Sequence, residues 1–449
     1  MQPVNPTNPQ RWSEPIRENL VRCRSAKTLL RKEPVVKQTI LRRLTFLPLV
    51  SLTMFTLLCI SSIFLQGSTS ALAASHSSSS VHSQALSTAL SGKERSHIPN
   101  SGTLNCSYPD LPSLQPFYSS PTVVNGIIYV GSVDHNVYAL NANCTVLWTY
   151  LTGAPVYSSP TVFNGVLYIG SDDHYIYALN AATGAFIWKH NLGNIVRSSP
   201  VTNGKFVYIG SNNHRVYALR VSNGSVQWSR LTGAPVTSSP RLYGNGKILY
   251  IGSQDHRVYA LNGFTGALIW SYTTGNAINR SSAAIAMVGS TADVFIGSTD
   301  TKLYALNAFT GAFYCSFTAS GPVESSPAVA TVGSSQIVYV GSDGTGSPPS
   351  NNGSFYALNA AACTQIWSYV PPAGPTRNWV IDTPTVAAVN GAVTVYFGSL
   401  DHSVFALDAG LGTVNWIYAT GNYVDSSPTV VNGLLYIGSN DGNLYELTA

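Results

Sequence analysis

Histidine is the side chain best suited to bind a transition metal or to move a proton near neutral pH. Five of the nine histidines recur at one position of a repeated phrase, each after Asp or Asn: His135, His174, His214, His256 and His402. Equivalent positions of successive repeats do not converge, whereas a metal ion needs three or four ligands within bonding distance. We therefore predict no metal site and expect these histidines to stabilise turns.

A second set of chemically capable residues precedes the Ser-Ser-Pro step that begins most repeats. The eight residues at this position are Tyr118, Tyr157, Arg197, Thr237, Arg280, Glu324, Ile381 and Asp425. Only 10% of the chain is charged, so the four charged side chains in this set are conspicuous. They indicate either a site for a polar ligand or peptide, or charges that are solvated or paired with one another.

The elements that position these residues are repeated strands. The glycine of an aromatic-x-Gly-Ser step recurs at intervals of 39 to 57 residues, at Gly131, Gly170, Gly210, Gly252, Gly297, Gly341, Gly398 and Gly438. Alternating Val, Ile, Leu and Tyr between Asn-Gly, Ser-x-Asp and Thr-Gly turns predict four antiparallel strands per repeat. An isolated hairpin is marginal in water, so neighbouring repeats must bury one another's apolar faces.

The basic character of the chain lies in one terminal segment. Residues 1–43 hold ten Lys or Arg against three Glu, whereas the rest of the chain has a net charge of −2 within a total of +5. A protein that follows nucleic-acid phosphates needs a basic surface on its folded part. We therefore predict no nucleic-acid partner, and we interpret residues 1–43 as a basic cytoplasmic segment.

An uncharged apolar stretch follows at residues 44–66, long enough to cross a bilayer, which needs about 20 residues. Its basic N-terminal flank predicts that the remainder of the chain lies outside the cytoplasm. Ala71-Leu72-Ala73 offers a cleavage site, so we expect either a single-pass anchor in the cell membrane or a signal sequence cut after Ala73, with secretion. The Ser-rich residues 67–101 are interpreted as a disordered linker.

The motif Ala-x-Thr-Gly-x-x-x-Trp, as in residues 181–188, resembles the tryptophan-docking repeat of the quinoprotein-like (PQQ-repeat) β-propellers. The resemblance covers residues 102–449 and implies an all-β, eight-bladed propeller, similar to the scaffold lipoprotein of outer-membrane barrel assembly. In that family the tryptophan of one blade packs on the Thr-Gly turn of the next. The matching residues here are Trp148, Trp188, Trp228, Trp270, Trp367 and Trp416.

Two repeats lack the docking tryptophan and have cysteines in its place. Cys315 replaces one tryptophan, and Cys363 replaces the turn glycine of the following repeat. Cys106 similarly lies at a tryptophan-like position, and Cys144 precedes Trp148 as Cys363 precedes Trp367. From the resemblance we predict the disulfides Cys106–Cys144 and Cys315–Cys363, which is one of the three possible pairings of these four cysteines. Residues 103–108 would then form the fourth strand of the last blade and close the ring.

Strand parity places the Gly-Ser-x-Asp-His turns and the segments before Ser-Ser-Pro at one mouth of the central channel. The sixth repeat has an eight-residue insertion after Gly341 and a longer connection after Trp367, both at this mouth. The second brings Arg377 and Trp379 beside Arg280 and Glu324. We therefore predict a ligand-binding mouth, while neutral insertions remain the alternative: its residues are Arg197, Arg280, Glu324, Arg377, Trp379 and Asp425.

The resemblance also includes dehydrogenases that use pyrroloquinoline quinone with calcium, a catalytic Asp and two adjacent cysteines. This sequence has no adjacent cysteine pair and no nucleophile elbow or phosphate loop. We predict a non-catalytic, membrane-tethered extracytoplasmic propeller that acts as a monomeric binding or scaffold module for a protein or peptide, with no cofactor. The alternatives are a quinone-dependent dehydrogenase and the detached sensor of a receptor.

Overall fold

The computed structural model describes residues 102–109, 115–345, 353–372 and 377–449. The chain divides into two units, Met1–Ser70 and Ala71–Ala449, and every described residue belongs to the second. The predicted basic segment, apolar stretch, cleavage site and Ser-rich linker, residues 1–101, therefore lie outside the described residues. Within the described ranges, no helix has the length and apolar character needed to cross a bilayer.

The described residues form eight four-stranded antiparallel sheets, as the repeat predicts. The strands of the first four sheets are β2 (Thr122–Val124), β3 (Ile127–Gly131), β4 (Asn136–Leu140), β5 (Val146–Leu151); β6 (Thr161–Phe163), β7 (Val166–Gly170), β8 (Tyr175–Asn180), β9 (Phe186–Asn191); β10 (Val201–Thr202), β11 (Phe206–Ser211), β12 (Arg215–Arg220), β13 (Val226–Leu231); β14 (Arg241–Tyr243), β15 (Ile248–Ser253), β16 (Arg257–Asn262) and β17 (Leu268–Thr273).

The strands of the other four sheets are β18 (Ala284–Val288), β19 (Thr291–Gly297), β20 (Lys302–Asn307), β21 (Phe313–Thr318); β22 (Ala328–Val332), β23 (Ser335–Ser342), β24 (Ser354–Asn359), β25 (Gln365–Tyr369); β26 (Thr385–Val389), β27 (Ala392–Ser399), β28 (Ser403–Asp408), β29 (Val414–Ala419); β30 (Thr429–Val431), β31 (Leu434–Gly438), β32 (Asn443–Thr448) and β1 (Leu104–Pro109). Each sheet is one blade, numbered one to eight in this order.

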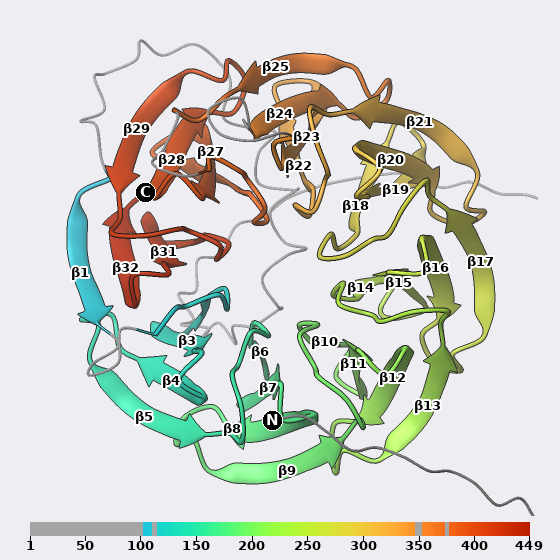
Figure 1. Cartoon of the computed structure of the whole chain (residues 1–449), viewed down its shortest axis with the longest axis vertical. Helices are drawn as coiled ribbons and strands as arrows, with labels where there is room; N and C mark the ends of the chain where they lie inside the picture. Colours follow the sequence, from blue (N-terminus) through green and yellow to red (C-terminus); the bar gives the residue numbers. More distant parts are fainter. Residues whose placement is uncertain (1–101, 110–114, 346–352, 373–376) are drawn as a thin grey trace, which may run out of the picture. The chain divides into compact units, whose positions relative to one another are not determined.

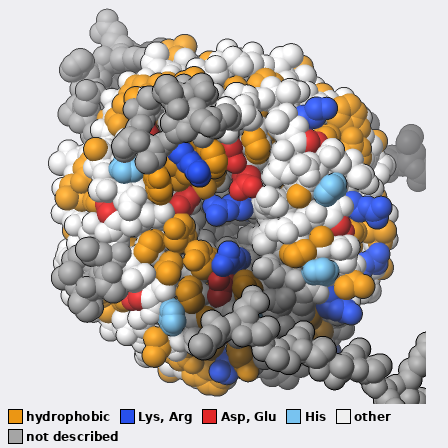
Figure 2. Space-filling view, in the orientation of Figure 1, with side chains coloured by type: hydrophobic (Ala, Val, Ile, Leu, Met, Phe, Trp, Pro, Cys, Tyr) orange, Lys and Arg blue, Asp and Glu red, His pale blue; other side chains and the backbone are white. Residues whose placement is uncertain are grey.

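The eight blades stand in a ring, with the first strand of each toward the centre and the fourth at the rim (Figure 1). The second and third strands are buried on both faces, as β7 and β8 show, whereas in β9 only Trp188 is buried. Each apolar cluster combines residues of two neighbouring blades, such as Tyr129 with Leu167. The core therefore lies between blades, and the face of the ring is hollowed at its centre (Figure 2).

The ring closes through the two ends of the described chain. Strand β1 pairs with β32, and the N–H of Gly102 donates to the carbonyl of Thr448 at 2.9 Å. In return the N–H of Thr448 donates to Thr103 at 3.0 Å. The predicted closing strand is therefore present, and β32 is not left as the edge of a three-stranded blade.

Neighbouring blades meet at the rim through tryptophan and glycine. Gly184 has a φ of +70°, and a Cβ on it would lie 2.6 Å from Trp148, so only glycine fits. The Trp148 indole also donates to the carbonyl of Ala181 at 3.0 Å. At the closure Trp416 packs on Gly102 in the same way. The N-terminal segment of the propeller thus supplies both the docking glycine, Gly102, and the fourth strand of the last blade. The docking glycine was not predicted from the sequence.

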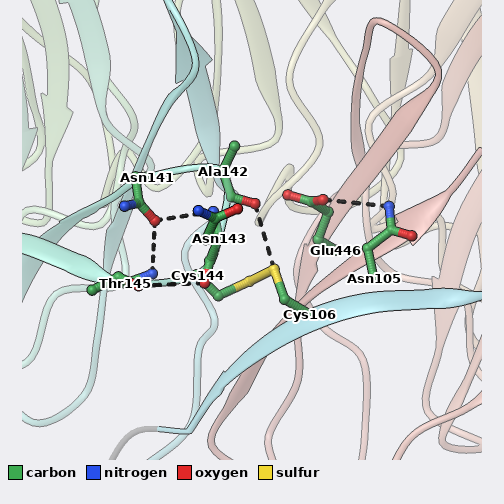
Figure 3. Close-up of a disulfide and its surroundings, with 8 residues drawn as sticks. All are labelled: Asn105, Cys106, Asn141, Ala142, Asn143, Cys144, Thr145 and Glu446. Atoms are coloured by element: carbon green, nitrogen blue, oxygen red, sulfur yellow. Dashed lines mark hydrogen bonds between the residues drawn. A yellow bond between two sulfur atoms is a disulfide. The ribbon is translucent and has the colours of Figure 1, made fainter.

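The other two junctions are disulfides, with the pairing that was predicted. Cys106 of β1 bonds to Cys144 in the turn between β4 and β5, and Cys315 of β21 bonds to Cys363 in the turn before β25. Cys144 and Cys363 have φ values of +55° and +52°, so they occupy the left-handed position that glycine holds elsewhere. Figure 3 shows the first bridge, with Glu446 of β32 beside it.

Candidate binding site at the channel mouth

The mouth is formed by the residues before Ser-Ser-Pro together with the turns between the second and third strands. Backbone bonds hold these two sets of loops side by side in every blade. The N–H of Asp172 donates to Pro155 at 2.9 Å, and that of Asp343 donates to Pro322 at 2.8 Å. Acidic and basic side chains gather around the hollow on this face (Figure 2).

Three of the predicted residues form one charged cluster, although three different blades supply them. The Arg280 guanidinium lies between two carboxylates: Nε is 3.8 Å from Glu324 Oε2, and Nη1 is 3.8 Å from Asp425 Oδ1. Asn279 donates to Glu324 at 2.8 Å, and Asn440 donates to Asp425 at 2.9 Å. The carboxylates are therefore fixed by amides, while the Arg280 side chain is 54% exposed.

Arg197 lies at the same ring position but is bound differently. It forms a two-pronged ion pair with Asp172, with Nη2 2.8 Å from Oδ2. Its guanidinium also lies 4.3 Å from the ring centre of Tyr157, which packs against Tyr118. Burial, followed by the charge of Asp425, raises the pKa of Tyr118. The structure thus places Arg197 in a separate pair beside aromatic rings and not in the Arg280 cluster.

Asp343 is a mouth residue that the sequence analysis missed. Only 7% of it is exposed, and its Oδ1 has no hydrogen-bond partner among the described residues. Burial, and then the nearby charge of Glu324, raise the pKa of Asp343 to about 7, against the opposing effects of Arg280 and Arg377. A signal was available, because Asp343 follows Gly-Ser just as Asp172 does.

The longer connection of the sixth blade brings a cation–π pair to this mouth. The Arg377 guanidinium lies 4.4 Å from the ring centre of Trp379. Asn378 between them is buried, accepts the N–H of Gly353 at 3.0 Å and donates to Pro371 at 2.8 Å. A buried amide therefore anchors an exposed Arg and a half-buried Trp. The rest of the predicted overhang, residues 346–352 and 373–376, lies outside the described residues.

The recurring histidines lie in left-handed turns. Their φ values run from +67° to +79°, and Thr301 and Gly442 take the same position in other blades. The preceding aspartate bonds the hairpin: Asp173 accepts Tyr175 N–H at 3.1 Å, the Tyr177 hydroxyl at 2.5 Å and Gly153 N–H at 2.8 Å. This geometry supports a structural role for the turn.

Metal-ligand atoms converge at one place in the described part of the chain, where Cys106, Cys144 and Glu446 lie together at the rim. Both sulfurs are already joined in the disulfide, so neither is a thiolate ligand. Among the described residues of the mouth, the carboxylates form no such group. This described donor set therefore does not fit a calcium ion, which takes six to eight oxygen ligands.

Comparison with protein families gives two matching ranges. The model described as "Outer membrane protein assembly factor BamB" matches residues 152–293 and 276–449. A comparison with curated sequences gave no match.

Solved structures share the fold at low identity. BamB from Moraxella catarrhalis is 19% identical with a TM-score of 0.58, over 77% of this chain and 99% of that one. Quinohemoprotein alcohol dehydrogenase from Comamonas testosteroni is 18% identical with a TM-score of 0.61, over 77% and 76%. The computationally designed Ika8 protein is 14% identical with a TM-score of 0.60, over 78% and 100%. These likenesses show the fold alone. Because the matched family ranges extend over most of the propeller, the chain belongs to the family described as outer membrane protein assembly factor BamB.

Proposed function

We propose that the protein is a non-catalytic, membrane-tethered extracytoplasmic module that binds a protein or peptide at the channel mouth. The observation that carries the proposal is the Arg280 cluster, which joins three blades. The charges of Arg280 and Arg377 both act on Asp343, which connects the cluster with the Arg377–Trp379 pair. The description of the family, an assembly factor for outer membrane proteins, supports a protein partner. The charged and aromatic residues of the mouth support contact through ion pairs and an aromatic surface.

The chemistry of the mouth suits a polypeptide. Arg280 lies 3.8 Å from its carboxylates, farther than the partners of a hydrogen-bonded pair at about 2.8 Å. A ligand carboxylate or carbonyl can therefore replace these carboxylates as the partner of Arg280. Glu324 and Asp425 would then accept a basic side chain. Trp379 supplies the aromatic surface that is common in binding hot spots.

The experiment is capture of partners from envelope extracts by the full chain and by matched variants. Arg280→Glu and Trp379→Ala change the mouth, whereas Met287→Ala changes an exposed residue of β18 at the opposite end of the blade. We expect one specific partner to be lost with both mouth variants and kept with Met287→Ala. A partner that is retained equally by all three variants contradicts the proposed site.

The membrane tether rests on the apolar residues 44–66 and is tested separately. We expect the full chain to sediment with membranes and to resist extraction at high salt and high pH. A chain that starts at residue 67 should stay in the soluble fraction. If the expressed protein is instead found in the soluble fraction and begins at residue 74, the apolar stretch is a cleaved signal sequence and the protein is secreted.

The dehydrogenases among the solved structures raise quinone chemistry as the competing function. The mouth residues fit it poorly: the described carboxylates do not converge on a cation, and both disulfides lie at the rim. Titration with pyrroloquinoline quinone and calcium, followed by dye reduction with alcohols, tests this. Turnover with any alcohol would replace our proposal with an oxidoreductase.

A further inference from the structure

The two disulfides of the rim, the closure bridge Cys106–Cys144 and the bridge formed by Cys315, lie in different chemical surroundings. A carboxylate oxygen of Glu446 lies within 4.8 Å of both sulfurs of the closure bridge. Among the described residues, no carboxylate or imidazole lies so close to both sulfurs of the Cys315 bridge. The strand register gives the reason, because Glu446 of β32 faces Cys106, whereas Ala305 of β20 faces Cys315. One bridge therefore has an acid beside it and the other does not.

The acid is buried and only partly bonded. Glu446 is 4% exposed, and its Oε1 accepts the side-chain N–H of Asn105 at 3.3 Å. Its Oε2 has no hydrogen-bond partner among the described residues. In Figure 3 this oxygen points away from Asn105, toward the turn that carries Cys144. It can therefore take up or release a proton beside the bridge without first breaking another hydrogen bond.

The other groups around Glu446 are uncharged. Tyr436 of β31 faces Glu446 across the strand pair, and burial, followed by the charge of Glu446, raises the pKa of Tyr436. The Tyr436 hydroxyl therefore keeps its proton at neutral pH. Asn105 and the turn at residues 141–145 contribute amides, a hydroxyl and backbone groups (Figure 3). Among the described residues, Glu446 is thus the group of this site that can exchange a proton with a sulfur.

The two sulfurs of the closure bridge differ in their access to solvent. Cys144 is 7% exposed in its turn, whereas Cys106 is half-buried on the outer strand β1. A thiol from solution therefore meets Cys106 first, and Cys144 is the sulfur that leaves. Exchange is faster when the leaving sulfur is a better leaving group, and a proton donor beside it has this effect, directly or through one water.

We propose that Cys106, Cys144 and Glu446 form a thiol–disulfide exchange site whose co-substrate is a dithiol. A thiolate of the dithiol bonds to the Cys106 sulfur as the Cys106–Cys144 bond breaks, and the electron pair passes to Cys144, which takes the proton of the Glu446 carboxyl. The second thiolate then displaces Cys106, which takes a proton from water, and the dithiol is oxidised to a disulfide. The two protons that the dithiol releases to water replace those taken from Glu446 and water. In the reverse direction, the Glu446 carboxylate takes the proton of Cys144.

Reduction at this site acts on the closure of the ring. Strand β1 keeps its pairing with β32, but its covalent link to the first blade is lost. The Cys315 bridge joins two other blades and has no acid beside it, so it should stay oxidised for longer. The site does not depend on the function proposed for the mouth.

Reduction of the full chain by dithiothreitol tests the site, with free thiols trapped at intervals and mapped by mass spectrometry, so that both bridges are followed in one sample. We expect the closure bridge to be reduced about tenfold faster than the Cys315 bridge, and Glu446→Gln to remove this advantage. Glutamine keeps the size of the side chain and the acceptor for Asn105 but cannot transfer the proton.

The pH profile separates proton transfer from a difference in exposure. Each rate is divided by the concentration of dithiothreitol thiolate, which removes the pH dependence of the reductant. The corrected rate of the closure bridge should then fall as the pH rises and Glu446 loses its proton. The corrected rates of the Cys315 bridge, and of the closure bridge in Glu446→Gln, should stay constant.

Three results would each overturn the proposal. They are equal rates for the two bridges in the unchanged protein, an unchanged rate in Glu446→Gln, and a faster rate in that variant, which would mean that the carboxylate only repels the attacking thiolate. Circular dichroism checks folding, and Glu446→Ala, which copies Ala305, is the second variant. If neither variant folds, the two rates and the pH profile of the unchanged protein still decide.

Discussion

The rim and the mouth of this propeller are built by opposite rules. At the rim, six junctions repeat one contact, a tryptophan on a left-handed glycine, and the other two replace both partners by cysteine. At the mouth, the equivalent position holds Tyr, Arg, Thr, Glu, Ile or Asp in different blades. The repeated rim contacts therefore specify the ring. The residues that differ between blades make one part of the mouth chemically different from another, and a specific binding site requires such a difference.

The rim should be the most sensitive part of the molecule. Trp188 is 6% exposed, packs on Gly224 and donates to the carbonyl of Val221 at 2.9 Å. We expect Trp188→Ala to lower the free energy of unfolding by about 3–5 kcal/mol, the usual cost of emptying a large buried site. Chemical denaturation measures this. A loss below about 1 kcal/mol would mean that the docking contact is not what joins the blades.

The disulfide junctions give the next largest effect. Replacing Cys315 and Cys363 by Ala should cost about 2–4 kcal/mol of unfolding free energy under oxidising conditions. The sharper test changes Cys315 to Trp and Cys363 to Gly, which restores the common junction. We expect this pair to recover most of the loss, and the same cysteine-to-alanine changes to have no effect under reducing conditions. No recovery would show that blades five and six have diverged beyond this contact.

The same restoration should fail at the ring closure, because of a neighbour that the repeat does not predict. Elsewhere an alanine faces the docking tryptophan across the strand pair, as Ala178 faces Trp188, but Glu446 faces Cys106. Glu446 is buried beside the bridge and accepts from Asn105 at 3.3 Å. A buried glutamate in place of alanine leaves less room for an indole here, so we expect that the two disulfide junctions are not interchangeable.

The fold was predictable from sequence because each of its determinants recurs. The spacing of Gly131 and its equivalents indicated eight blades, and paired losses of Trp and Gly indicated which cysteines bond. Docking of Trp416 on Gly102 was missed, because the turn that contains this glycine is divided between the two ends of the chain.

The candidate site was less predictable, because it depends on contacts between single residues of different blades. Sequence placed Arg280, Glu324 and Asp425 at one mouth but gave no reason to separate Arg197, which Asp172 binds. The position of Asp343 after Gly-Ser was visible in the sequence, but its burial was not, because the surrounding loops bury it. The repeated part of the sequence thus predicts the scaffold. The contacts made by residues that depart from the repeat can be seen only in the structure.

Asp382 tests whether a single departure from the repeat has an energetic cost. It replaces the first serine of Ser-Ser-Pro and accepts the N–H of Gly398 at 2.8 Å, as Ser198 accepts that of Gly210 at 3.0 Å. Burial raises its pKa well above the usual value, so the folded carboxyl stays protonated where the unfolded one ionises. Its contribution to stability is therefore greatest at low pH and falls as the pH rises above about 4.

Asp382→Ser should consequently stabilise the protein at pH 7, by about 1–3 kcal/mol, through removal of a buried acid with an unpaired Oδ1. The gain should shrink as the pH approaches 4. Denaturation of both proteins at a series of pH values measures this difference. A gain that is constant with pH would assign the effect to side-chain size and not to ionisation.

The smallest effect on stability is expected at the mouth, and there the contrast with the rim becomes quantitative. Arg280→Ala removes a guanidinium that is 54% exposed and lies 3.8 Å from each carboxylate. Although the Asp425 side chain is only 8% exposed, Asn440 still donates to it, so we expect a loss of about 1 kcal/mol. Trp379→Ala should likewise change stability by about 0.5 kcal/mol or less, because its ring is half-buried over Arg377. Both variants should nevertheless lose the partner that Met287→Ala retains. If either one unfolds the ring as Trp188→Ala is expected to, the mouth belongs to the scaffold, and the division between a repeated frame and a variable binding surface fails.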